Sequence, residues 1–436
     1  MNTIYMEQFG PIQKAEIDLE KNIQVFIGTQ ASGKSTICKT IYFCQKIRDY
    51  TLDFLMNEEQ FASNHPNEYF NNYLKYLTRQ FMGCFGKTTH MQKFRICHQF
   101  AEKRIVIHLN QDGYVRFSFD KSLKNEIEAL MKEASELFLN GFSQNEVRSI
   151  LDSMTALAVM KQQLQGALYH LFENDKEIIY IPAGRSLLAT MSEQLYDVST
   201  TDMDLTMQEF IHLIRNTKGK FGTKIPDMVK NYTKTVKGQI NNTSVEKAYE
   251  LIRRIFKADY TNESDGEKLY FEERHWVKLM YASSGQQEVL WILMLLFIAV
   301  LEKRNSFFLI EEPEAHLFPI AQKDIVCLIS LMVNATGSKV ILTTHSPYIL
   351  TSWNVLLYSE KVEGLQKGKK QTIIPKNQRA SFQSFAAYKM EGAEEKTRFL
   401  ESILDEESHM IRTDYIDEVS SITNKELESL LDMEME

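Results

Sequence analysis

Short apolar runs separated by longer amphipathic stretches recur along the 436-residue chain. Four runs are rich in β-branched and aromatic residues and too short for helices, so they predict buried strands: Ile23–Ile27, Ile178–Ile181, Phe307–Ile310 and Lys339–Thr343. Much of the sequence between them repeats apolar residues at i, i+3 and i+4, the period of a helix packed on one face. Strands that alternate with helices indicate an α/β fold with a mainly parallel central sheet.

Two stretches depart from this alternation and predict antiparallel hairpins. Residues 104–120 alternate apolar and polar positions around Asn110-Gln111-Asp112-Gly113, a turn signal, and Leu269–Met280 has a similar pattern. Residues 51–93 indicate irregular helices, and residues 121–174 have a clear helical period. We therefore expect an antiparallel β lobe and large helical insertions beside the central sheet.

These patterns divide the chain into three parts. Residues 1–50 and 175–355 would form the core domain, in which residues 187–280 form a helical lobe. Residues 51–174 would be inserted helices that carry the first hairpin. Residues 356–436 are polar and increasingly acidic, so we expect a peripheral C-terminal tail region.

Composition excludes several classes of protein. Hydrophobic residues make up 44% of the chain and charged residues 25%, which excludes a disordered chain, a collagen and a polytopic membrane protein. The net charge of -8 argues against a uniformly basic nucleic-acid coat, although a local basic patch stays open. The longest apolar run, Val289–Leu301, is shorter than the roughly 20 residues that span a bilayer. No signal peptide is evident, and the five cysteines show neither a disulfide framework nor zinc-site spacing, so we expect a cytoplasmic protein.

The strongest chemical signal is a loop placed directly after a predicted strand and directly before a predicted helix: Gly28-Thr29-Gln30-Ala31-Ser32-Gly33-Lys34-Ser35-Thr36. It fits the pattern G-x-x-x-x-G-K-[ST], in which backbone N–H groups and the helix N-terminus surround phosphate groups. Lys34 would reach the β- and γ-phosphates, and the Ser35 hydroxyl would bind Mg²⁺. The alternative is a glycine-rich turn with a chance lysine, which the flanking strand and helix disfavour.

Two carboxylates follow the predicted strand at residues 307–310. Glu311 and Glu312 would lie at its C-terminal end, where α/β proteins bind their ligands. Glu311 would bind Mg²⁺ through water, and Glu312 would polarise an attacking water molecule as a general base. Taken alone, such a pair is equally compatible with a solvated strand end.

Two further polar turns have weaker signals. Thr343-Thr344-His345-Ser346-Pro347 ends another predicted strand, although a lone histidine is more often structural than functional. Ala282-Ser283-Ser284-Gly285-Gln286-Gln287 opens the long apolar helix. Serine and glycine there are ordinary capping residues, but the same N–H groups and the helix dipole also make an anion site.

The order and spacing of these four motifs resemble the ABC-type ATPases, and more closely their RecF-like, SMC-like and OLD-like branch. The resemblance covers residues 1–50 and about 175–355. It implies that Ser283, Ser284, Gly285 and Gln286 form the signature loop, with Ser283 as the phosphate-binding serine. It also implies that Glu311 and Glu312 belong to Walker B and that His345 is the switch histidine. No Asp-x-Asp follows these motifs, so the chain resembles a stand-alone member without a Toprim nuclease domain.

The resemblance implies an ATPase that uses ATP and Mg²⁺ and works as a homodimer or higher homo-oligomer. Two ATP molecules would lie between copies, each contacted by the P-loop, Walker B and His345 of one copy and the signature loop of the other. Similar stand-alone proteins belong to prokaryotic antiviral systems, which implies control of a separately encoded effector such as a nuclease or toxin. The helices of residues 121–174 and the acidic tail are candidate docking surfaces for it.

Two alternative functions stay open. The first is a DNA-repair or chromosome-maintenance ATPase that clamps DNA, although no heptad arms of coiled-coil length are visible. The second is the nucleotide-binding subunit of a membrane transporter, which the Gln-Gln-Glu after the signature glycine and the missing Q-loop glutamine disfavour. No membrane contact is therefore expected.

Two positions depart from the ABC pattern. Glu311 occupies a position that is usually aspartate. Ile179-Tyr180-Ile181-Pro182-Ala183-Gly184-Arg185 resembles the strand that enters the Q-loop, but Ala183 stands where glutamine is usual. Arg185 would either substitute for that glutamine or form a surface salt bridge.

A lysine-rich stretch is a candidate nucleic-acid surface. Residues 216–240 carry six lysines against one aspartate, Asp227: Lys218, Lys220, Lys224, Lys230, Lys234 and Lys237. Such a cluster either contacts phosphates or forms a solvated helical face. The single Asp-x-Asp, Asp202-Met203-Asp204, is interpreted as capping or surface chemistry.

Overall fold

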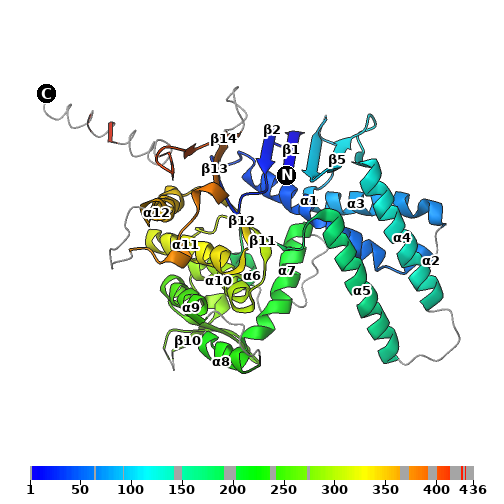
Figure 1. Ribbon diagram of the computed structural model, residues 1–436. Helices are drawn as coiled ribbons and strands as arrows, with labels where there is room; N and C mark the ends of the chain where they lie inside the picture. Colours follow the sequence, from blue (N-terminus) through cyan, green and yellow to red (C-terminus); the bar gives the residue numbers. More distant parts are fainter. Residues whose placement is uncertain are drawn as a thin grey trace.

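The computed structural model describes residues 2–62, 65–91, 93–141, 150–190, 203–235, 242–272, 275–363, 373–390, 400–412, 424–425 and 428. Two sheets organise these residues, one central and mostly parallel, the other antiparallel, with helices packed around both (Figure 1). The fold is therefore a mixed α/β fold of the class predicted from the alternation of apolar runs.

The central sheet has the strand order β14-β13-β3-β12-β11-β7. All neighbouring strands pair in parallel except β14, which is antiparallel to β13. The strands are β3 (Ile23–Gly28), β7 (Glu177–Ile181), β11 (Ser306–Glu311), β12 (Lys339–Thr344), β13 (Phe385–Met390) and β14 (Leu400–Ser402). The four strands predicted from apolar runs are confirmed as β3, β7, β11 and β12. Every residue of β11 is buried, as expected of a strand covered on both faces.

Strand β13 corrects the expected peripheral position of residues 356–436. It pairs with β3, with Phe385 opposite Ile23 and Met390 opposite Gly28, so this part of the chain belongs to the central sheet. Helix α12 (Pro347–Glu363) precedes it and packs Trp353 against Phe385, with ring centroids 5.3 Å apart. The short strands β15 (Leu404–Asp405) and β16 (Met410–Ile411) follow it. Most of the predicted acidic tail beyond residue 412 lies outside the described residues.

The antiparallel sheet has the order β2-β1-β4-β5-β6. Its strands are β1 (Asn2–Phe9), β2 (Ile12–Asp18), β4 (Arg95–Phe100), β5 (Lys103–Leu109) and β6 (Val115–Phe119). The hairpin predicted within residues 104–120 is confirmed as β5 and β6. Because β1 pairs with β4, the N-terminal residues and the predicted insertion at 51–174 share one sheet. The predicted boundary at residue 50 therefore does not separate two folding units.

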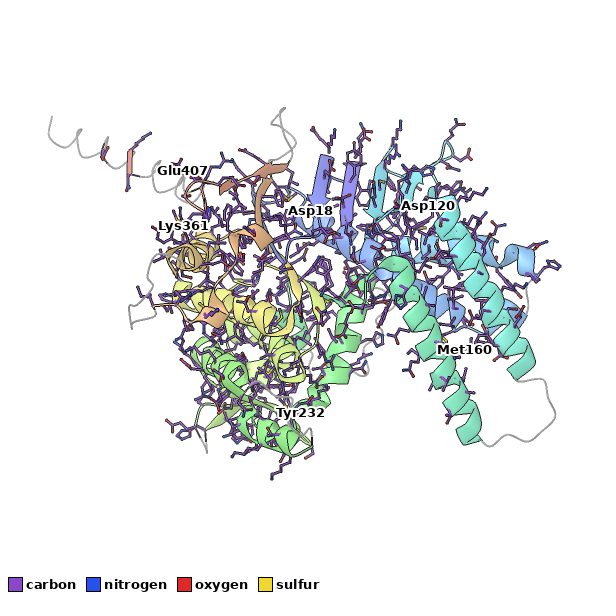
Figure 2. All side chains as sticks on the ribbon, in the orientation of Figure 1. Asp18, Asp120, Met160, Tyr232, Lys361 and Glu407 are labelled. Atoms are coloured by element: carbon purple, nitrogen blue, oxygen red, sulfur yellow. The ribbon has the colours of Figure 1, made fainter. Side chains whose placement is uncertain are left out.

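Helices connect the two sheets and extend from them. Helices α1 (Lys34–Leu55), α2 (Glu59–Ala62) and α3 (Tyr69–Phe85) pack against the antiparallel sheet through a cluster of aromatic residues. Helices α4 (Lys121–Gly141) and α5 (Ile150–Phe172) project together from this lobe (Figure 1), with Met160 midway along α5 (Figure 2). The antiparallel sheet and its helices form one of two large apolar clusters.

The second apolar cluster joins the central sheet to a helical lobe. The lobe contains α6 (Ser186–Thr190), α7 (Leu205–Lys218), α8 (Ile225–Thr235) and α9 (Asn242–Phe256). It also holds a three-stranded antiparallel sheet of β8 (Asp259–Glu263), β9 (Gly266–Tyr270) and β10 (Trp276–Lys278), which confirms the second predicted hairpin. Helices α10 (Ser284–Glu302) and α11 (Pro319–Thr336) complete this cluster.

Helix α10 contains the longest apolar run of the sequence. Among the described helices, it alone is long and apolar enough to pass a test for a membrane-spanning segment. However, 83% of the tested window is buried inside the protein, and residues 289–301 are all buried. A core helix of this kind passes the same test, so α10 is accounted for by the apolar cluster that surrounds it.

Candidate active site

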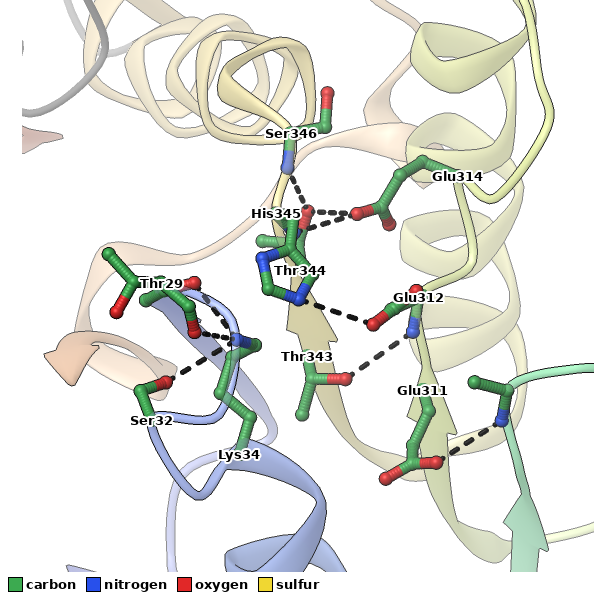
Figure 3. A network of polar contacts seen from close by, with 12 residues as sticks. Thr29, Ser32, Lys34, Glu311, Glu312, Glu314, Thr343, Thr344, His345 and Ser346 are labelled. Atoms are coloured by element: carbon green, nitrogen blue, oxygen red, sulfur yellow. Dashed lines mark hydrogen bonds and ion pairs between the residues drawn. The ribbon is translucent and has the colours of Figure 1, made fainter. Parts of the chain in front are cut away.

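The P-loop connects β3 to α1 at the carboxyl edge of the central sheet. Its lysine folds back over the loop: Lys34 Nζ donates to the carbonyl oxygens of Gly28 and Thr29, each at 2.9 Å, and to Ser32 Oγ at 3.4 Å (Figure 3). Burial lowers the pKa of Lys34, and the nearby glutamates oppose that shift. A lysine held this way is available to exchange carbonyl oxygens for phosphate oxygens.

The backbone of the loop depends on its glycines. Gly33, the residue before α1, has a φ of 94°, a left-handed conformation that glycine adopts without strain. A Cβ at Gly28 would lie 2.6 Å from the Met390 carbonyl oxygen and 2.7 Å from Ser32 Oγ. The C-terminal strand β13 thus packs directly against the first residue of the loop. This contact explains why β13, although distant in sequence, is part of the site.

The carboxylate of Glu311 lies at the end of β11 and is almost completely buried. Its Oε2 accepts a hydrogen bond of 3.1 Å from the Ala183 N–H, while Oε1 is buried without a hydrogen-bond partner among the described residues (Figure 3). Ala183 thus contributes its backbone at the position where the ABC pattern has a glutamine side chain.

The buried Glu311 Oε1, which has no hydrogen-bond partner among the described residues, and the exposed Ser35 hydroxyl fit Mg²⁺, which binds one or two protein oxygens and keeps waters and substrate phosphates as its other ligands. Among the described residues there is no cluster of three or more histidine, cysteine, aspartate or glutamate side chains that could hold a metal alone. The donor set therefore suits a metal shared with a nucleotide.

Glu312 follows directly and has a φ of 44°, a strained conformation for a residue other than glycine. Its N–H donates to the carbonyl oxygen of Thr343 at 3.1 Å, which joins the ends of β11 and β12. Its Oε1 lies 3.3 Å from Nε2 of His345, the residue after β12 (Figure 3). Burial and then the Lys34 charge lower the pKa of His345. The strained backbone thus presents Glu312 and His345 side by side, near Lys34.

Glu314 is a buried carboxylate that the sequence motifs included without assigning it a role. It accepts hydrogen bonds from Thr344 Oγ1 at 2.6 Å and from the His345 N–H at 2.9 Å. Burial raises the pKa of Glu314. Through these two bonds it fixes the turn that carries His345. The signal in the sequence was a third acid three residues after Glu311, which the apolar strand pattern alone could not place.

Arg185 is completely buried, so the alternative of a surface salt bridge is wrong. Its guanidinium donates to the carbonyl oxygens of Pro182, Glu311 and Glu312, with 2.7 Å to Glu311 and 2.9 Å to Glu312. It also forms an ion pair of 3.3 Å with Glu288 on α10. The residue therefore connects the end of β7, the end of β11 and the helix that carries the signature loop.

The signature loop begins α10 and is capped within its own chain. Ser283 Oγ accepts from the Gln286 N–H at 3.3 Å, and Gln286 Oε1 accepts from the Ser283 N–H at 3.3 Å, which makes a capping box. A Cβ at Gly285 would lie 2.7 Å from the His316 carbonyl oxygen, so this position requires glycine. Ser283 forms its polar contacts with Gln286, and Lys34 forms its own within the P-loop. These two residues therefore share no polar contact within one chain.

The site residues predicted from sequence thus fall into two groups. The structure brings together the P-loop, Glu311, Glu312 and His345 (Figure 3). The signature residues Ser283, Ser284, Gly285 and Gln286 form a second group at the start of α10, linked to the first through Arg185 and Glu288.

The described part of the lysine-rich stretch, residues 216–235, makes several contacts within the chain. Lys220 pairs with Glu302, Lys230 pairs with Asp227 at 3.2 Å, and Lys224 lies 4.8 Å from the centre of the Tyr270 ring. Lys218 is buried and also has a partner, whereas Lys237 lies outside the described residues. These contacts favour the second interpretation of the described lysines, a solvated helical face with ion pairs, over a nucleic-acid surface.

The Asp-x-Asp motif has a structural role at its described end. Asp204 is the N-cap of α7: its side chain accepts from the Met207 N–H at 3.1 Å and pairs with Lys39 at 3.3 Å. The prediction of capping chemistry is confirmed for Asp204, while Asp202 lies outside the described residues.

Comparison with known proteins identifies the family. The model of the AAA ATPase domain family matches residues 1–350. The chain belongs to this family. It is therefore an ATPase with a nucleotide-binding P-loop, as the sequence motifs predicted. No curated protein matches the chain.

Two solved structures show a distant likeness to this ATPase. One is an SMC head bound to the C-winged helix domain of ScpA, with 13% sequence identity and a TM-score of 0.35. The other is the SMC head domain from Thermotoga maritima, with 10% identity and a TM-score of 0.34. Each alignment covers 80% of this chain and 90% of the other.

Proposed function

We propose that this ATPase binds Mg²⁺ and ATP between two copies of the chain, and that this assembly controls a separately encoded effector protein. In each site, the P-loop, Glu311, Glu312 and His345 would come from one copy and the Ser283 turn from the other. The ATP-dependent assembly is thus a head-to-tail homodimer, and a higher homo-oligomer would use the same contact.

An exposed apolar edge beside the signature loop carries this proposal. Tyr281 and Phe318 flank the contact between Gly285 and His316, and they are 74% and 77% exposed. Ile320, two residues after Phe318, is also largely exposed. Large apolar side chains gathered beside an anion-binding helix N-terminus are typical of a surface that another protein covers. A second copy would cover these side chains, and the phosphates of the ATP bound to its P-loop would then meet the start of α10.

The residues near the P-loop would divide the chemistry of hydrolysis. Lys34 would neutralise charge on the β- and γ-phosphates, and Ser35 and Glu311 would hold Mg²⁺, which lowers the cost of charge on the phosphate oxygens. Glu312 would accept a proton from the attacking water. At the same time, the water oxygen would bond to the γ-phosphorus, and the bond between that phosphorus and the oxygen that stays on ADP would break. His345, within hydrogen-bond range of Glu312, would orient it toward that water.

Control of an effector follows from the energetics of the sandwich. The γ-phosphate supplies charge that both copies contact, so its removal weakens the assembly and shifts the population toward separate copies. Helices α4 and α5 project from the protein and carry exposed apolar residues, Leu137 and Val159, which makes them a candidate effector contact (Figure 1). The resemblance to ATPases of prokaryotic antiviral systems suggests a nuclease or toxin as this effector and defence as the context.

A mixing experiment tests the shared site. Lys34→Ala and Ser283→Arg should each abolish ATP turnover alone, because each spoils both sites of a homodimer. Mixed in equal amounts after exchange of copies, they should recover about a quarter of the parent turnover, since half of the dimers contain one intact site out of two.

The control is a mixture of Lys34→Ala with Glu312→Gln, in which both changes fall on the same side of the site. No heterodimer of this pair contains an intact site, so its turnover should stay at the level of the single variants. Equal recovery in both mixtures, or recovery in neither, would contradict a site shared between copies.

A further inference from the structure

A groove lies between helix α3 and strand β6, in the antiparallel lobe. It has a volume of about 880 Å³ and is lined by one face of α3, the residues that follow α3, and β6 with its preceding turn. Its apolar walls include Leu74, Met82 and Phe117, and Tyr114 at its rim is 66% exposed. Neither the mechanism of the ATPase nor the contact between copies uses this groove.

Strand β6 offers a free edge to this groove. It is the last strand of the sheet and pairs with β5, Arg116 opposite His108 and Phe117 opposite Ile107. In the part of the chain that the structure describes, no second strand pairs with β6. In an antiparallel pair, alternate N–H and C=O groups point away from the partner strand. These outward groups are available to an added strand.

Four cations surround the groove: Lys75, Arg79, Lys87 and Arg116. None of the fourteen lining residues is acidic. No carboxylate of the described residues forms an ion pair with any of the four, and the printed contact of Lys75 is to Asn72 Oδ1 at 3.4 Å. In the helical lobe, by contrast, four lysines form ion pairs with carboxylates: Lys220, Lys230, Lys247 and Lys268. The groove thus carries an uncompensated positive charge in a protein whose net charge is -8.

We propose that the groove between α3 and β6 binds an extended, acidic segment of a partner protein, which adds to the edge of β6 as a sixth strand. A helix beside an exposed strand edge is the arrangement by which many domains bind peptides through strand addition. Backbone groups of β6 would supply hydrogen bonds, the apolar wall would receive alternate side chains, and the four cations would pair with carboxylates.

This recognition needs no nucleotide and no second copy of the ATPase, so it stands or falls separately from the function proposed above. An apolar wall and a free strand edge favour a peptide over a nucleic acid, because phosphate groups can accept from the N–H groups of the edge but have no donor for its C=O groups, whereas a peptide backbone pairs with both. Charges on β6 itself also discourage edge-to-edge aggregation, which explains Arg116 but not the three cations that come from α3 and the turn after it.

The test uses the full chain and a fluorescent peptide of about eight residues that alternates Glu with Val, a length near that of a typical strand. Anisotropy should show saturable binding, and a matched peptide that alternates Lys with Val should not bind. Arg79→Glu combined with Arg116→Glu should weaken binding by about tenfold or more. Lys132→Glu, an exposed change on α4 outside the groove, should have little effect. ATP turnover reports that each variant is folded.

Two readouts separate strand addition from simple charge attraction. Binding should slow hydrogen exchange of the backbone amides of Val115–Phe119. A Glu-Val peptide with an N-methyl group on every residue should bind at least about tenfold more weakly, because it has no N–H group left to donate to a strand edge. Equal binding of the methylated peptide, no change in exchange at β6, or competition by oligo-dT with higher affinity than the peptide would each overturn the proposal.

Discussion

Arg185 and Glu288 form a buried ion pair of 3.3 Å that links, within one chain, the residues around the P-loop to the helix that begins with the Ser283 turn. The Glu288 carboxylate also accepts from the N–H groups of Arg185 and Ser186, at 3.0 and 3.2 Å. Burial lowers the pKa of Arg185, and the charge of Glu288 opposes this. The guanidinium also donates to the backbone carbonyl oxygens of Glu311 and Glu312, so α10 is joined to the backbone that carries the two carboxylates.

The first prediction concerns this link. Arg185→Lys should lower the turnover number for ATP by about tenfold to a hundredfold, because an ammonium cannot reach all the acceptors and small displacements of reacting groups are costly. Nucleotide affinity should change by no more than about threefold, since Arg185 does not belong to the P-loop. Steady-state kinetics and nucleotide-binding measurements together separate these effects. Arg304→Lys, in a partly exposed pair with Glu302, is the matched control and should leave both values near the parent.

The second prediction concerns Lys34. Lys34→Ala should weaken nucleotide binding by about 2 kcal/mol, roughly thirtyfold, because a charge-assisted contact with phosphate is removed. Titration with a fluorescent ATP analogue would measure the change. Lys39→Ala on the same helix removes only the ion pair with Asp204 and should keep the parent affinity. Parent-like affinity of the Lys34 variant would overturn the P-loop assignment.

The third prediction concerns Glu312. Glu312→Gln should bind ATP but reduce turnover by about a hundredfold to ten-thousandfold, because the amide cannot accept the proton of the attacking water. With ATP present, light scattering should show a larger assembly that persists. Glu136→Gln, an exposed change on α4, should keep parent turnover. If the Glu312 variant kept parent turnover, this residue would have no part in catalysis.

The fourth prediction concerns pH and the fully buried His98. Its Nε2 lies 3.1 Å from Asn2 Oδ1 and 3.3 Å from Gln45 Nε2, and burial lowers its pKa to about 3. The folded state thus holds a neutral imidazole, whereas the unfolded chain takes up a proton below pH 6.5 or so. The free energy of unfolding should therefore fall as the pH drops from about 6.5 toward 3, with this residue contributing up to about 1.4 kcal/mol per pH unit.

Urea unfolding between pH 7.5 and pH 4.5 would measure this slope. His98→Gln removes the titrating group, so its stability should depend less steeply on pH, although it is less stable than the parent at neutral pH. His212→Gln, on the exposed surface of α7, should keep the parent slope. A His98 variant with an unchanged slope would show that other groups cause the acid sensitivity.

The sequence predicted the parts of the fold that have strong local signals. Strands β3, β7, β11 and β12 are short apolar runs, and both predicted hairpins carry their own turn or alternation signals. Strand β13 was missed because its segment, Phe385–Met390, is brief, contains Lys389 and follows a polar stretch. What makes it a strand is pairing with β3, more than 350 residues earlier in the sequence. No local pattern encodes such a pairing.

The site shows the same division. The P-loop and the acids after β11 were found because their chemistry lies in consecutive residues. Arg185 was left between two interpretations, since its burial results from three elements that meet only in the folded chain: β7, β11 and α10. The shared sheet of β1 and β4 was missed for a related reason, because α1, α2 and α3 separate these strands in the sequence.

The last prediction tests a contact that sequence alone gave no reason to expect. Gly285 lies against the backbone of His316, which has a φ of 58°, so a methyl group at Gly285 would meet the His316 carbonyl oxygen at 2.7 Å. A backbone oxygen cannot move aside as a flexible side chain can. Gly285→Ala should therefore push apart the signature loop and the segment after Glu312, and it should lower both ATP turnover and thermal stability, the latter by about 1–3 kcal/mol.

Gly166 provides the matched control for this substitution. It lies within helix α5, and a Cβ there would meet no atom within 4 Å. Gly166→Ala should raise stability by about 0.5–1 kcal/mol, because alanine restricts the unfolded chain and favours helix, while ATP turnover stays at the parent value. In a thermal unfolding experiment, Gly285→Ala should lower the free energy of unfolding and Gly166→Ala should raise it. Such opposite changes would show that the His316 contact, rather than the loss of a glycine, determines the effect. If Gly285→Ala matched Gly166→Ala in both readouts, the packing of the signature loop against His316 would be wrong.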